Sequence, residues 1–450
     1  MKNKLICSKT VCDMATNLGI KNTQAPLSFT LELTRNKVKE RICVHTTDFN
    51  MNFPGLEEAI VTKTAIVDGE VHIHIEMERE PHRCPCCSEW TSKVHDYRIQ
   101  KVQHLKMWER PTVLFYRRRR YVCRCGKRFS EQIKLVERYQ RHTLEWNQAL
   151  GLRVIQGKNF TDTARQFHTS PTTVMRRFDQ IAAPMLSEVK ELPSVIAIDE
   201  YKGDTEKGKY QVMIADGLTG KPLDILPDRA VQTVKRYLQQ KGSQVRIVVM
   251  DMSHSFKSAV DQALGKPVIV ADRFHFCRYI YWALDRIRRR VQKEFHEYDR
   301  KKCKRMKHVF HKHAQDLTEK QHWYLQRYLS LSEELREAYE VKEAYRDWFE
   351  TAKQAGQHDV RSVKEELHLF YQCVEASEMQ EFQDVLKTFR NWKVAILNSF
   401  AYGYTNGPIE GLNNQTKVIK RNAFGFRRYD RFRFRVLLHH QFKNEHFQVG

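Results

Sequence analysis

Three acidic residues stand where apolar, strand-like runs of this chain end. Asp199 follows SVIAI, Asp251 follows QVRIVVM and Asp272 follows VIVA. A buried strand that ends in a carboxylate places charge at the rim of a sheet, and carboxylate oxygens are preferred ligands of Mg²⁺ and Mn²⁺. Neighbouring strands lie about 4.8 Å apart, so acids on adjacent strands can share ions. The pattern predicts a site for two Mg²⁺ (or Mn²⁺) ions.

A third metal ligand is expected from a helix that packs beside these strands. The candidate is Glu410 in the segment YTNGPIEGLNN, where Asn406 is predicted to cap the helix and Pro408 to occupy its first turn. Asp199, Asp251 and Glu410 are therefore the predicted catalytic and Mg²⁺-binding residues. Two ions held by such a trio activate an attacking oxygen and stabilise the leaving oxygen of a phosphodiester. Asp272 and His275 are expected to support the site rather than to bind the ions.

Four cysteines fall into two pairs with metal-ligand spacing. Cys84 and Cys87 belong to a CPCC motif, and Cys123 and Cys125 form a CRC motif. Four thiolates in two pairs suit tetrahedral Zn²⁺, so we expect a structural zinc ion there. Cys86, His82 and His104 are alternative ligands, and reduced cysteines without metal are the other interpretation.

Four consecutive arginines precede the second cysteine pair. Arg117, Arg118, Arg119 and Arg120 are expected to project from both faces of a strand and to bind DNA phosphates. The alternative is a strand edge kept from aggregating by its charge.

The segment NFTDTARQFHTSPTTVMRRFDQIA predicts a helix-turn-helix. Thr161 is expected to cap the first helix, and Ser170 and Pro171 to begin the second. The predicted DNA-contacting residues of the second helix are Thr172, Thr173, Arg176 and Arg177. A plain helical hairpin fits the same pattern.

The charge balance favours a polyanionic partner. The formal net charge is +23, and binding to nucleic acid releases counterions from its phosphates. Lys417, Lys420 and Arg421 follow Glu410 closely and are expected to hold DNA there. The aromatic residues interleaved with the next arginines either pack in a core or stack on bases, and we expect most of them to pack: Phe424, Phe426, Tyr429, Phe432 and Phe434.

The order of patterns indicates a multi-domain α/β protein. Three meandering strands at residues 195–226 precede alternating strands and helices, which is the order of a ribonuclease H-like mixed sheet. The predicted parts are a weakly structured leader (1–50), N-terminal strands with a zinc ribbon (51–140), a helix-turn-helix (141–190), a catalytic domain (191–277 and 403–442) and a large all-helical insertion (278–402). We expect no membrane span and no secretory signal, and hence a cytoplasmic, nucleoid-associated protein.

Several of these motifs together resemble the ISL3 family of bacterial insertion-sequence transposases. They are the CPxC knuckle, TDTARQFHTSPTTVMRRF, VIAIDE, VVMDMS, ADRFH and TNGPIEGLNNQTKVIKRNAFGFRRYDRFR. The resemblance implies a DDE-type, ribonuclease H-like enzyme with a helical insertion before its Glu. It matches Asp199, Asp251 and Glu410 to the three acids and Asp272 and His275 to a DxxH element. Lys417, Lys420 and Arg421 match the basic residues after the Glu.

The function expected from residues and resemblance is that of a DNA transposase. It would bind double-stranded DNA at the terminal inverted repeats of its element, cleave a strand and transfer it to target DNA. A homodimer or larger assembly is expected, because two ends must be joined. The alternatives are a catalytically inactive DNA-binding regulator on the same scaffold and a nuclease without strand transfer.

Overall fold

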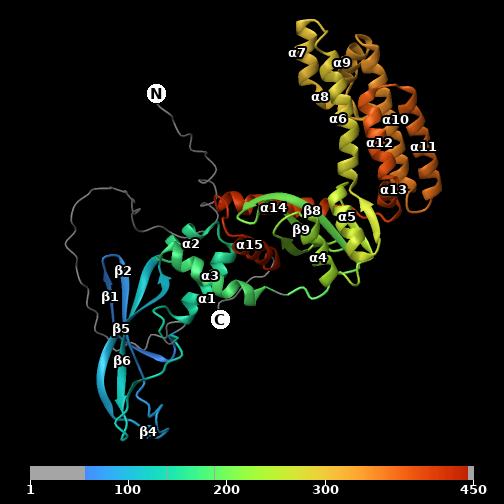
Figure 1. The fold of residues 1–450 in the computed structure, drawn as a ribbon. Coiled ribbons are helices and arrows are strands. Elements are labelled where there is room, and N and C mark those ends of the chain that lie inside the picture. The colour runs from blue at the N-terminus through green and yellow to red at the C-terminus, as the bar shows by residue number, and fades with distance from the viewer. Residues whose placement is uncertain (1–55, 138, 187, 444–450) are drawn as a thin grey trace, which may run out of the picture.

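The computed structural model describes residues 56–137, 139–186 and 188–443. The leader predicted for residues 1–50 lies outside them. An N-terminal sheet, a small helical group, a central sheet and a long helical insertion follow one another from one end of the molecule to the other (Figure 1).

The N-terminal sheet is built around two hairpins in the order β1-β2-β6-β5, with β7 paired to β6. Asp68 and Gly69 form the turn between β1 and β2, and both residues have positive φ angles, 50° and 80°. Alternating residues of β2 face a core shared with β6 and are buried: Val71, Ile73 and Ile75. The strands are β1 (Ala59–Val67), β2 (Glu70–Met77), β5 (Val94–Met107), β6 (Arg110–Val122) and β7 (Arg128–Ser130), with β3 (His82–Arg83) and β4 (Trp90–Thr91) forming a separate small ribbon.

Three helices follow: α1 (Leu144–Gln156), α2 (Phe160–Gln166) and α3 (Pro171–Met185). The prediction that Ser170 caps the second helix of the hairpin is confirmed, because its side chain accepts a hydrogen bond from the Thr173 amide. The prediction for Thr161 is wrong. Asn159 caps α2 instead, accepting from the Asp162 amide, since the chain turns helical two residues earlier than expected.

The central sheet has the order β10-β9-β8-β11-β12. The antiparallel meander β8–β9–β10 continues into β11 and β12, which run parallel to β8, so the predicted mixed α/β sheet is confirmed. Helices α4 and α5 cover one face and α14 and α15 the other. The elements are β8 (Val195–Thr205), β9 (Gly208–Asp216), β10 (Pro222–Leu226), α4 (Val231–Lys241), β11 (Ile247–Met250), α5 (His254–Leu264), β12 (Val268–Ala271), α14 (Gly407–Asn422) and α15 (Tyr429–Gln441).

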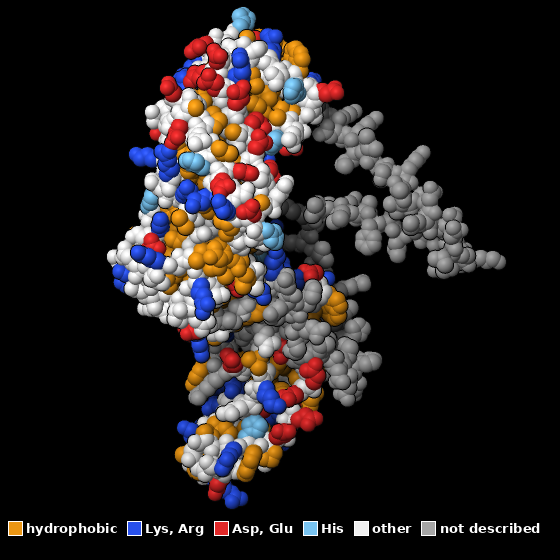
Figure 2. Space-filling view, turned by 90° about the vertical axis from the view of Figure 1, so that its right-hand side faces the viewer, with side chains coloured by type: hydrophobic (Ala, Val, Ile, Leu, Met, Phe, Trp, Pro, Cys, Tyr) orange, Lys and Arg blue, Asp and Glu red, His pale blue; other side chains and the backbone are white. Residues whose placement is uncertain are grey.

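The chain between β12 and α14 is helical, as predicted, and extends away from the central sheet (Figure 1). Its apolar faces form one continuous core with the α4–α5 face of the sheet. Figure 2 shows many acidic side chains on this insertion, at the top of the view. The helices are α6 (Arg273–Val291), α7 (Glu297–Arg305), α8 (Lys307–His311), the 3₁₀ turn η2 (Ala314–Asp316), α9 (Glu319–Ser330), α10 (Glu333–Ala355), α11 (Val360–Ala376), α12 (Gln380–Asn391) and α13 (Lys393–Ala401).

A glycine substitution tests the packing of the β8–β9 hairpin. A Cβ atom added at Gly203 would lie 1.6 Å from the Oε1 atom of Gln211. Gln211 is fully buried, and its Nε2 atom donates to the carbonyl oxygens of Gly208 and Pro227, so it cannot move aside. We expect Gly203→Ala to destabilise the protein by about 2 kcal/mol, measured by urea unfolding.

Gly411→Ala is the matched control. This glycine lies within α14, and an added Cβ would meet nothing within 4 Å. The substitution should raise stability by up to about 1 kcal/mol through helix propensity. Equal effects of the two substitutions would contradict the packing described here.

Candidate active site

The three acids come directly after the point at which parallel pairing between β8, β11 and β12 ends. In β8, β11 and β12, Ile198 pairs with Met250 and Met250 with Ala271. Asp199, Asp251 and Asp272 are the next residues of the respective strands, so they stand in one row across the sheet.

The prediction that Asp199 ends its strand is wrong. β8 continues to Thr205, because its residues beyond Asp199 still pair with β9. The parallel neighbour of β8 does end at this level, because β11 stops at Met250, which pairs with Ile198. The loss of pairing on that side leaves the Asp199 carboxylate beside Asp251.

The row of acids faces α14. Side chains alternate along a strand, so Asp199 shares the face of Ala197, which packs in one core with Ile409 and Leu412 of α14. From this helix the Nδ2 atom of Asn413 donates a hydrogen bond of 2.7 Å to the Oδ2 atom of Asp199. Glu410, in the first turn of α14, lies close enough to Asp272 for its charge to raise the pKa of that carboxyl. The structure thus places Glu410 near Asp272, at one side of the row of acids.

Asn413 is a site residue that the sequence analysis missed. It lies three residues after Glu410, on the same side of the helix. That spacing was the available signal, but an asparagine in a helix carries no strong chemical signature. Its hydrogen bond orients the Asp199 carboxylate toward the other acids.

Burial makes the carboxylates reluctant to ionise. Burial is the largest cause that raises the pKa of Asp199, to about 6, and the charge of Asp251 raises it further, whereas His275 and Asn413 oppose the shift. Burial also raises the pKa of Asp251 and of Asp272. Half-buried carboxylates that repel one another are stabilised by bound cations, so the donor set fits divalent ions with oxygen ligands.

Asp272 and His275 lie close to each other where β12 ends and α6 begins. The Nδ1 atom of His275 is 3.9 Å from the Oδ2 atom of Asp272. Burial raises the pKa of Asp272, while backbone groups of Phe274 and Asn406 lower it. Asn406 precedes α14, so Asp272 links the end of β12 to the start of the helix that carries Glu410.

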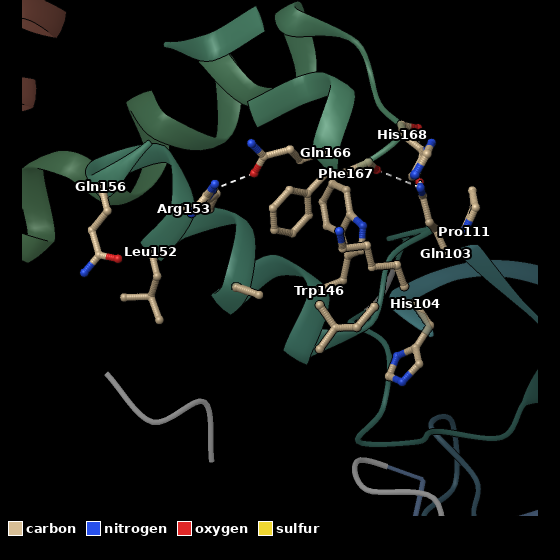
Figure 3. Close-up of a pocket in the computed structure, with 13 residues that line it drawn as sticks. Gln103, His104, Pro111, Trp146, Leu152, Arg153, Gln156, Gln166, Phe167 and His168 are labelled. Atoms are coloured by element: carbon tan, nitrogen blue, oxygen red, sulfur yellow. Dashed lines mark hydrogen bonds between the residues drawn. The ribbon is translucent and has the colours of Figure 1, made fainter. Parts of the chain in front are cut away.

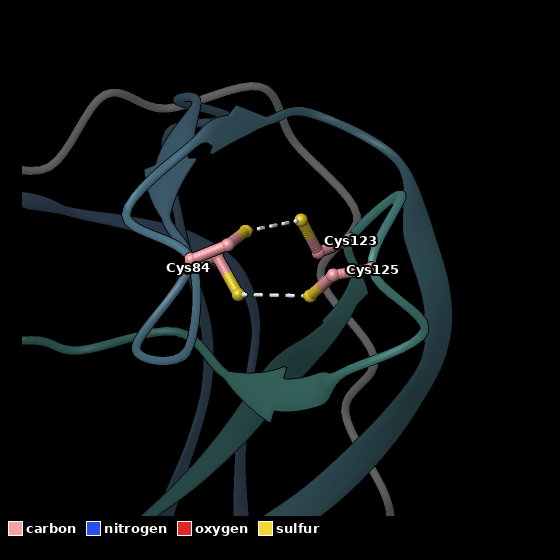
Figure 4. Close-up of side chains that lie close together, drawn as sticks. Cys84, Cys123 and Cys125 are labelled. Atoms are coloured by element: carbon pink, nitrogen blue, oxygen red, sulfur yellow. Dashed lines mark hydrogen bonds between the residues drawn. The ribbon is translucent and has the colours of Figure 1, made fainter.

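The cysteine pairs form a second site, at the far end of the N-terminal sheet. The Sγ atoms of Cys84 and Cys125 are 3.7 Å apart, and those of Cys87 and Cys123 are 3.4 Å apart. Figure 4 shows the two pairs facing each other across a gap between two loops. A tetrahedron with Zn–S bonds of about 2.3 Å has S–S edges of about 3.8 Å. All four Sγ atoms lie within 4.8 Å of one another, so small adjustments suffice for them to hold Zn²⁺.

Neither Cys86 nor the two histidines join this group. Within the described residues, the four cysteines are the only set of three or more possible ligands whose atoms all lie within 4.8 Å of one another. The Cys86 side chain is exposed, and only its amide contributes, with a hydrogen bond to the Sγ atom of Cys84. His104 is buried 2.9 Å from the Thr143 hydroxyl. The carboxylates of Asp199, Asp251, Asp272 and Glu410 do not form such a group among the described residues.

The arginine run alternates between faces, as predicted, but one of its members is not available to DNA. Arg119 is buried and forms ion pairs with Glu131 and Glu76, so its predicted role in DNA binding is wrong. Arg117 stacks on Tyr97, Arg118 donates to the Glu131 carbonyl, and Arg120 pairs with Asp96. These three keep surface exposure and remain candidates.

The helix-turn-helix is joined to the N-terminal sheet. Between β5, α1 and α2 lies a cavity of about 520 Å³, bridged where the Nε2 atom of Gln103 donates to the Phe167 carbonyl (Figure 3). On α3, Thr172 and Arg176 are exposed, whereas Arg177 donates to the side chain of Gln140. The Thr173 hydroxyl lies 2.9 Å from that of Ser170.

The basic residues of α14 differ in how they are held. Lys417 and Arg421 are exposed. Lys420 is paired with Asp204 of the β8–β9 hairpin at 2.8 Å, which leaves part of its charge neutralised.

Comparisons with known proteins identify the family. A transposase family model matches residues 196–436, which is more than half of the chain. The chain belongs to the ISL3 family of transposases. A model of the helix-turn-helix domain of this family matches residues 131–182, and a model of the zinc-finger of the transposases of IS204, IS1001, IS1096 and IS1165 matches residues 80–125. The cysteine group is therefore a structural zinc site.

A curated relative agrees with this assignment. The chain is 25% identical over 372 residues to the transposase for insertion sequence element IS1001 of Bordetella parapertussis, covering 78% of this chain and 87% of the relative. A shorter match, 44% identical over 59 residues, is to a protein of Lactococcus lactis named ATP-dependent protease and covers only 13% of this chain and 19% of that protein. So short a match carries no argument about activity. Among the described residues of this ISL3 transposase, no helix has the length and apolar character needed to cross a membrane.

Metal analysis tests the zinc site. The purified full-length protein should contain about one zinc per chain, and Cys87→Ser should lower that content by at least about half because three thiols hold the ion less tightly. Cys86→Ser is the matched control and should retain the metal. Zinc lost from the Cys86 variant but kept in the Cys87 variant would contradict the ligand set.

The pH dependence of stability tests the burial of Asp199. Its pKa in the folded protein is about 6, above the ordinary value of 3.8, so the folded state is favoured by protonation and loses stability as the pH rises through about 6. Asp199→Asn removes this loss but also one hydrogen-bond acceptor. Without added divalent ions it should stabilise the protein by about 2 kcal/mol at neutral pH and by close to nothing near pH 4, measured by urea unfolding. If the difference in stability between Asp199→Asn and the wild type did not change with pH, the burial of Asp199 would be contradicted.

Proposed function

We propose that the site is a DDE-type catalytic centre on a ribonuclease H-like sheet. Asp199, Asp251 and Glu410 would hold two Mg²⁺ or Mn²⁺ ions. The observation that carries the proposal is the common end of parallel pairing in β8, β11 and β12, which aligns Asp199 and Asp251 beneath α14. The strand order β10-β9-β8-β11-β12, an antiparallel meander followed by parallel strands, supports the fold assignment.

The chain's own residues supply orientation and charge. The carboxylates of Asp199 and Asp251 emerge from rigid strands, and Asn413 fixes the rotamer of Asp199. Glu410 reaches the site from the first turn of α14, whose position Asp272 sets through Asn406. When bound, the two ions activate water or a 3′-hydroxyl as the nucleophile and stabilise the leaving oxygen. His275 offsets part of the negative charge, since it lowers the pKa of each of the three aspartates.

DNA would be held by the modules that precede and follow the site. The helix-turn-helix would read the terminal inverted repeats through Thr172, Thr173, Arg176 and Arg177, and the zinc-bearing sheet would contact phosphates through Arg117, Arg118 and Arg120. Lys417, Lys420 and Arg421 would hold the strand beside Glu410. A dimer or larger assembly would bring two ends together for strand transfer.

Cleavage of DNA that carries the element's ends tests the proposal. The substrate is a plasmid that carries the DNA on either side of the coding region, where the inverted repeats are expected. With Mg²⁺, the protein should nick at the repeats and join the exposed 3′-ends to target DNA. Asp199→Ala, Asp251→Ala and Glu410→Gln should each lower the rate at least about a thousandfold, since each removes a ligand of the ions.

The control is Glu365→Gln, which changes an exposed acid of α11 that pairs with Arg361 of the same helix. Its activity should equal that of the wild type. Unchanged activity in Asp199→Ala would refute the assignment of the site. Nicking without joined products would identify a nuclease, and specific binding without nicking would identify a DNA-binding regulator.

A further inference from the structure

A second cavity lies between the helix-turn-helix and the connection from α14 to α15. Its volume is about 580 Å³. Figure 1 shows α2 and α3 on the side of the molecule where α14 ends and α15 begins. Several direct contacts hold the walls together. Among them, the Nδ2 atom of Asn159 donates to the Asn422 carbonyl, and Arg431 forms a two-pronged ion pair with Asp179 of α3. The cavity is therefore bounded by packed elements on both sides.

Arg435 lines this cavity, and within the described residues its buried charge takes part in no ion pair. The residue is 3% exposed. Its Nη2 atom donates to the Gly157 carbonyl, but its Nη1 atom is buried and has no hydrogen-bond partner among the described residues. Burial lowers the pKa of Arg435 to about 10. A buried, partly unsatisfied guanidinium is unfavourable until an anion reaches it.

The remaining charges around the cavity are also mostly positive. Lys158, Arg165 and Arg427 line it and are exposed, and within the described residues none of their side chains takes part in an ion pair. The acids nearby are already engaged: Asp179 with Arg428 and Arg431, and Asp162 with the side chain of Gln166. The electrostatics therefore favour a phosphate group, for which arginine is well suited.

An aromatic side chain at the same cavity lacks a packing role. Phe424 is 94% exposed, whereas Phe426, Tyr429 and Phe432 of the same segment are buried. Its φ angle is +56°, a left-handed conformation that is uncommon for a bulky residue. Left-handed backbone conformations of bulky residues are concentrated at functional sites. The exposed ring of Phe424 offers a surface on which a base can stack.

We propose that this cavity binds one unpaired nucleotide of a DNA strand, with its phosphate on Arg435 and its base against Phe424. A cavity of this volume suits a ligand of nucleotide size, and a base-paired helix is too wide to enter it. The inference rests on the proposed function, since it takes DNA to be the substrate. It adds a consequence: residues 423–428 directly follow the helix that carries Glu410, so a nucleotide bound here connects end recognition to the catalytic helix.

Binding to tailed hairpin DNA tests the proposal without requiring catalysis. Three probes share one duplex: a blunt hairpin, the hairpin with three unpaired thymidines, and the hairpin with three abasic residues, with tails of each polarity made separately. The readout is the ratio of Kd values between blunt and tailed probes at one salt concentration, which cancels duplex binding. We expect the thymidine tail to tighten binding about fivefold to a hundredfold, and the abasic tail to do so less.

Two exposed variants assign the contacts. Phe424→Ala should remove the difference between thymidine and abasic tails, and Arg427→Ala should weaken both tails. Their matched controls in the helical insertion, Trp323→Ala and Arg361→Ala, change residues that are also exposed and should leave the ratios unchanged. Equal Kd values of the wild-type protein for blunt and tailed probes would overturn the proposal. So would a Phe424→Ala variant that still distinguishes thymidine from abasic tails as the wild type does. Absence of duplex binding itself would instead overturn the proposed function.

Arg435→Met separates anion binding from a structural role. Because it removes a buried charge but preserves length, it should raise the Tm of the DNA-free protein and abolish the gain from the abasic tail. A lower Tm would show that Arg435 stabilises the packing of the helices, and would refute its role as a residue that binds a DNA phosphate.

Discussion

The structure depends on where three parallel strands stop pairing. In the last parallel pairs of β8, β11 and β12, Met250 lies between Ile198 and Ala271. The residues that follow them, Asp199, Asp251 and Asp272, therefore lie side by side. A slip of one residue in β11 would turn Asp251 to the opposite face, away from α14. The apolar residues of each strand therefore do more than form a core: they fix the register that aligns the carboxylates.

This alignment is unfavourable for the protein alone. Burial and mutual repulsion raise the pKa values of the acids, and only partial compensation comes from His275 and Asn413. The surrounding structure tolerates this because both faces of the sheet are covered, by α4 and α5 on one side and by α14 and α15 on the other. Arg435 is a buried positive charge, which a bound anion would stabilise in the same way as bound cations would stabilise the carboxylates. Buried carboxylates and a buried guanidinium are both typical of binding sites, where a ligand of opposite charge stabilises groups that the fold alone leaves in an unfavourable environment.

Much of this was predictable from the sequence, because strong local signals were present. The strands that lead to the acids are short apolar runs, Ser170 before Pro171 marks the start of a helix, and paired cysteines in a chain of this kind indicate zinc. Other features depend on tertiary contacts that no local pattern reports. The extension of β8 past Asp199 comes from its pairing with β9, the burial of Arg119 from Glu131 and Glu76, and the role of Asn413 from the packing of α14. Of the five aromatic residues after α14, only the structure singles out Phe424 as exposed.

The central claim is that acids from distant parts of the chain meet around shared divalent ions. Anomalous diffraction from crystals of the full-length protein soaked with Mn²⁺ locates those ions directly. Manganese is expected within coordination distance of Asp199 and Asp251, with Glu410 completing the site from α14. Manganese bound elsewhere, or a Glu410 carboxylate turned away from an occupied aspartate pair, would contradict it.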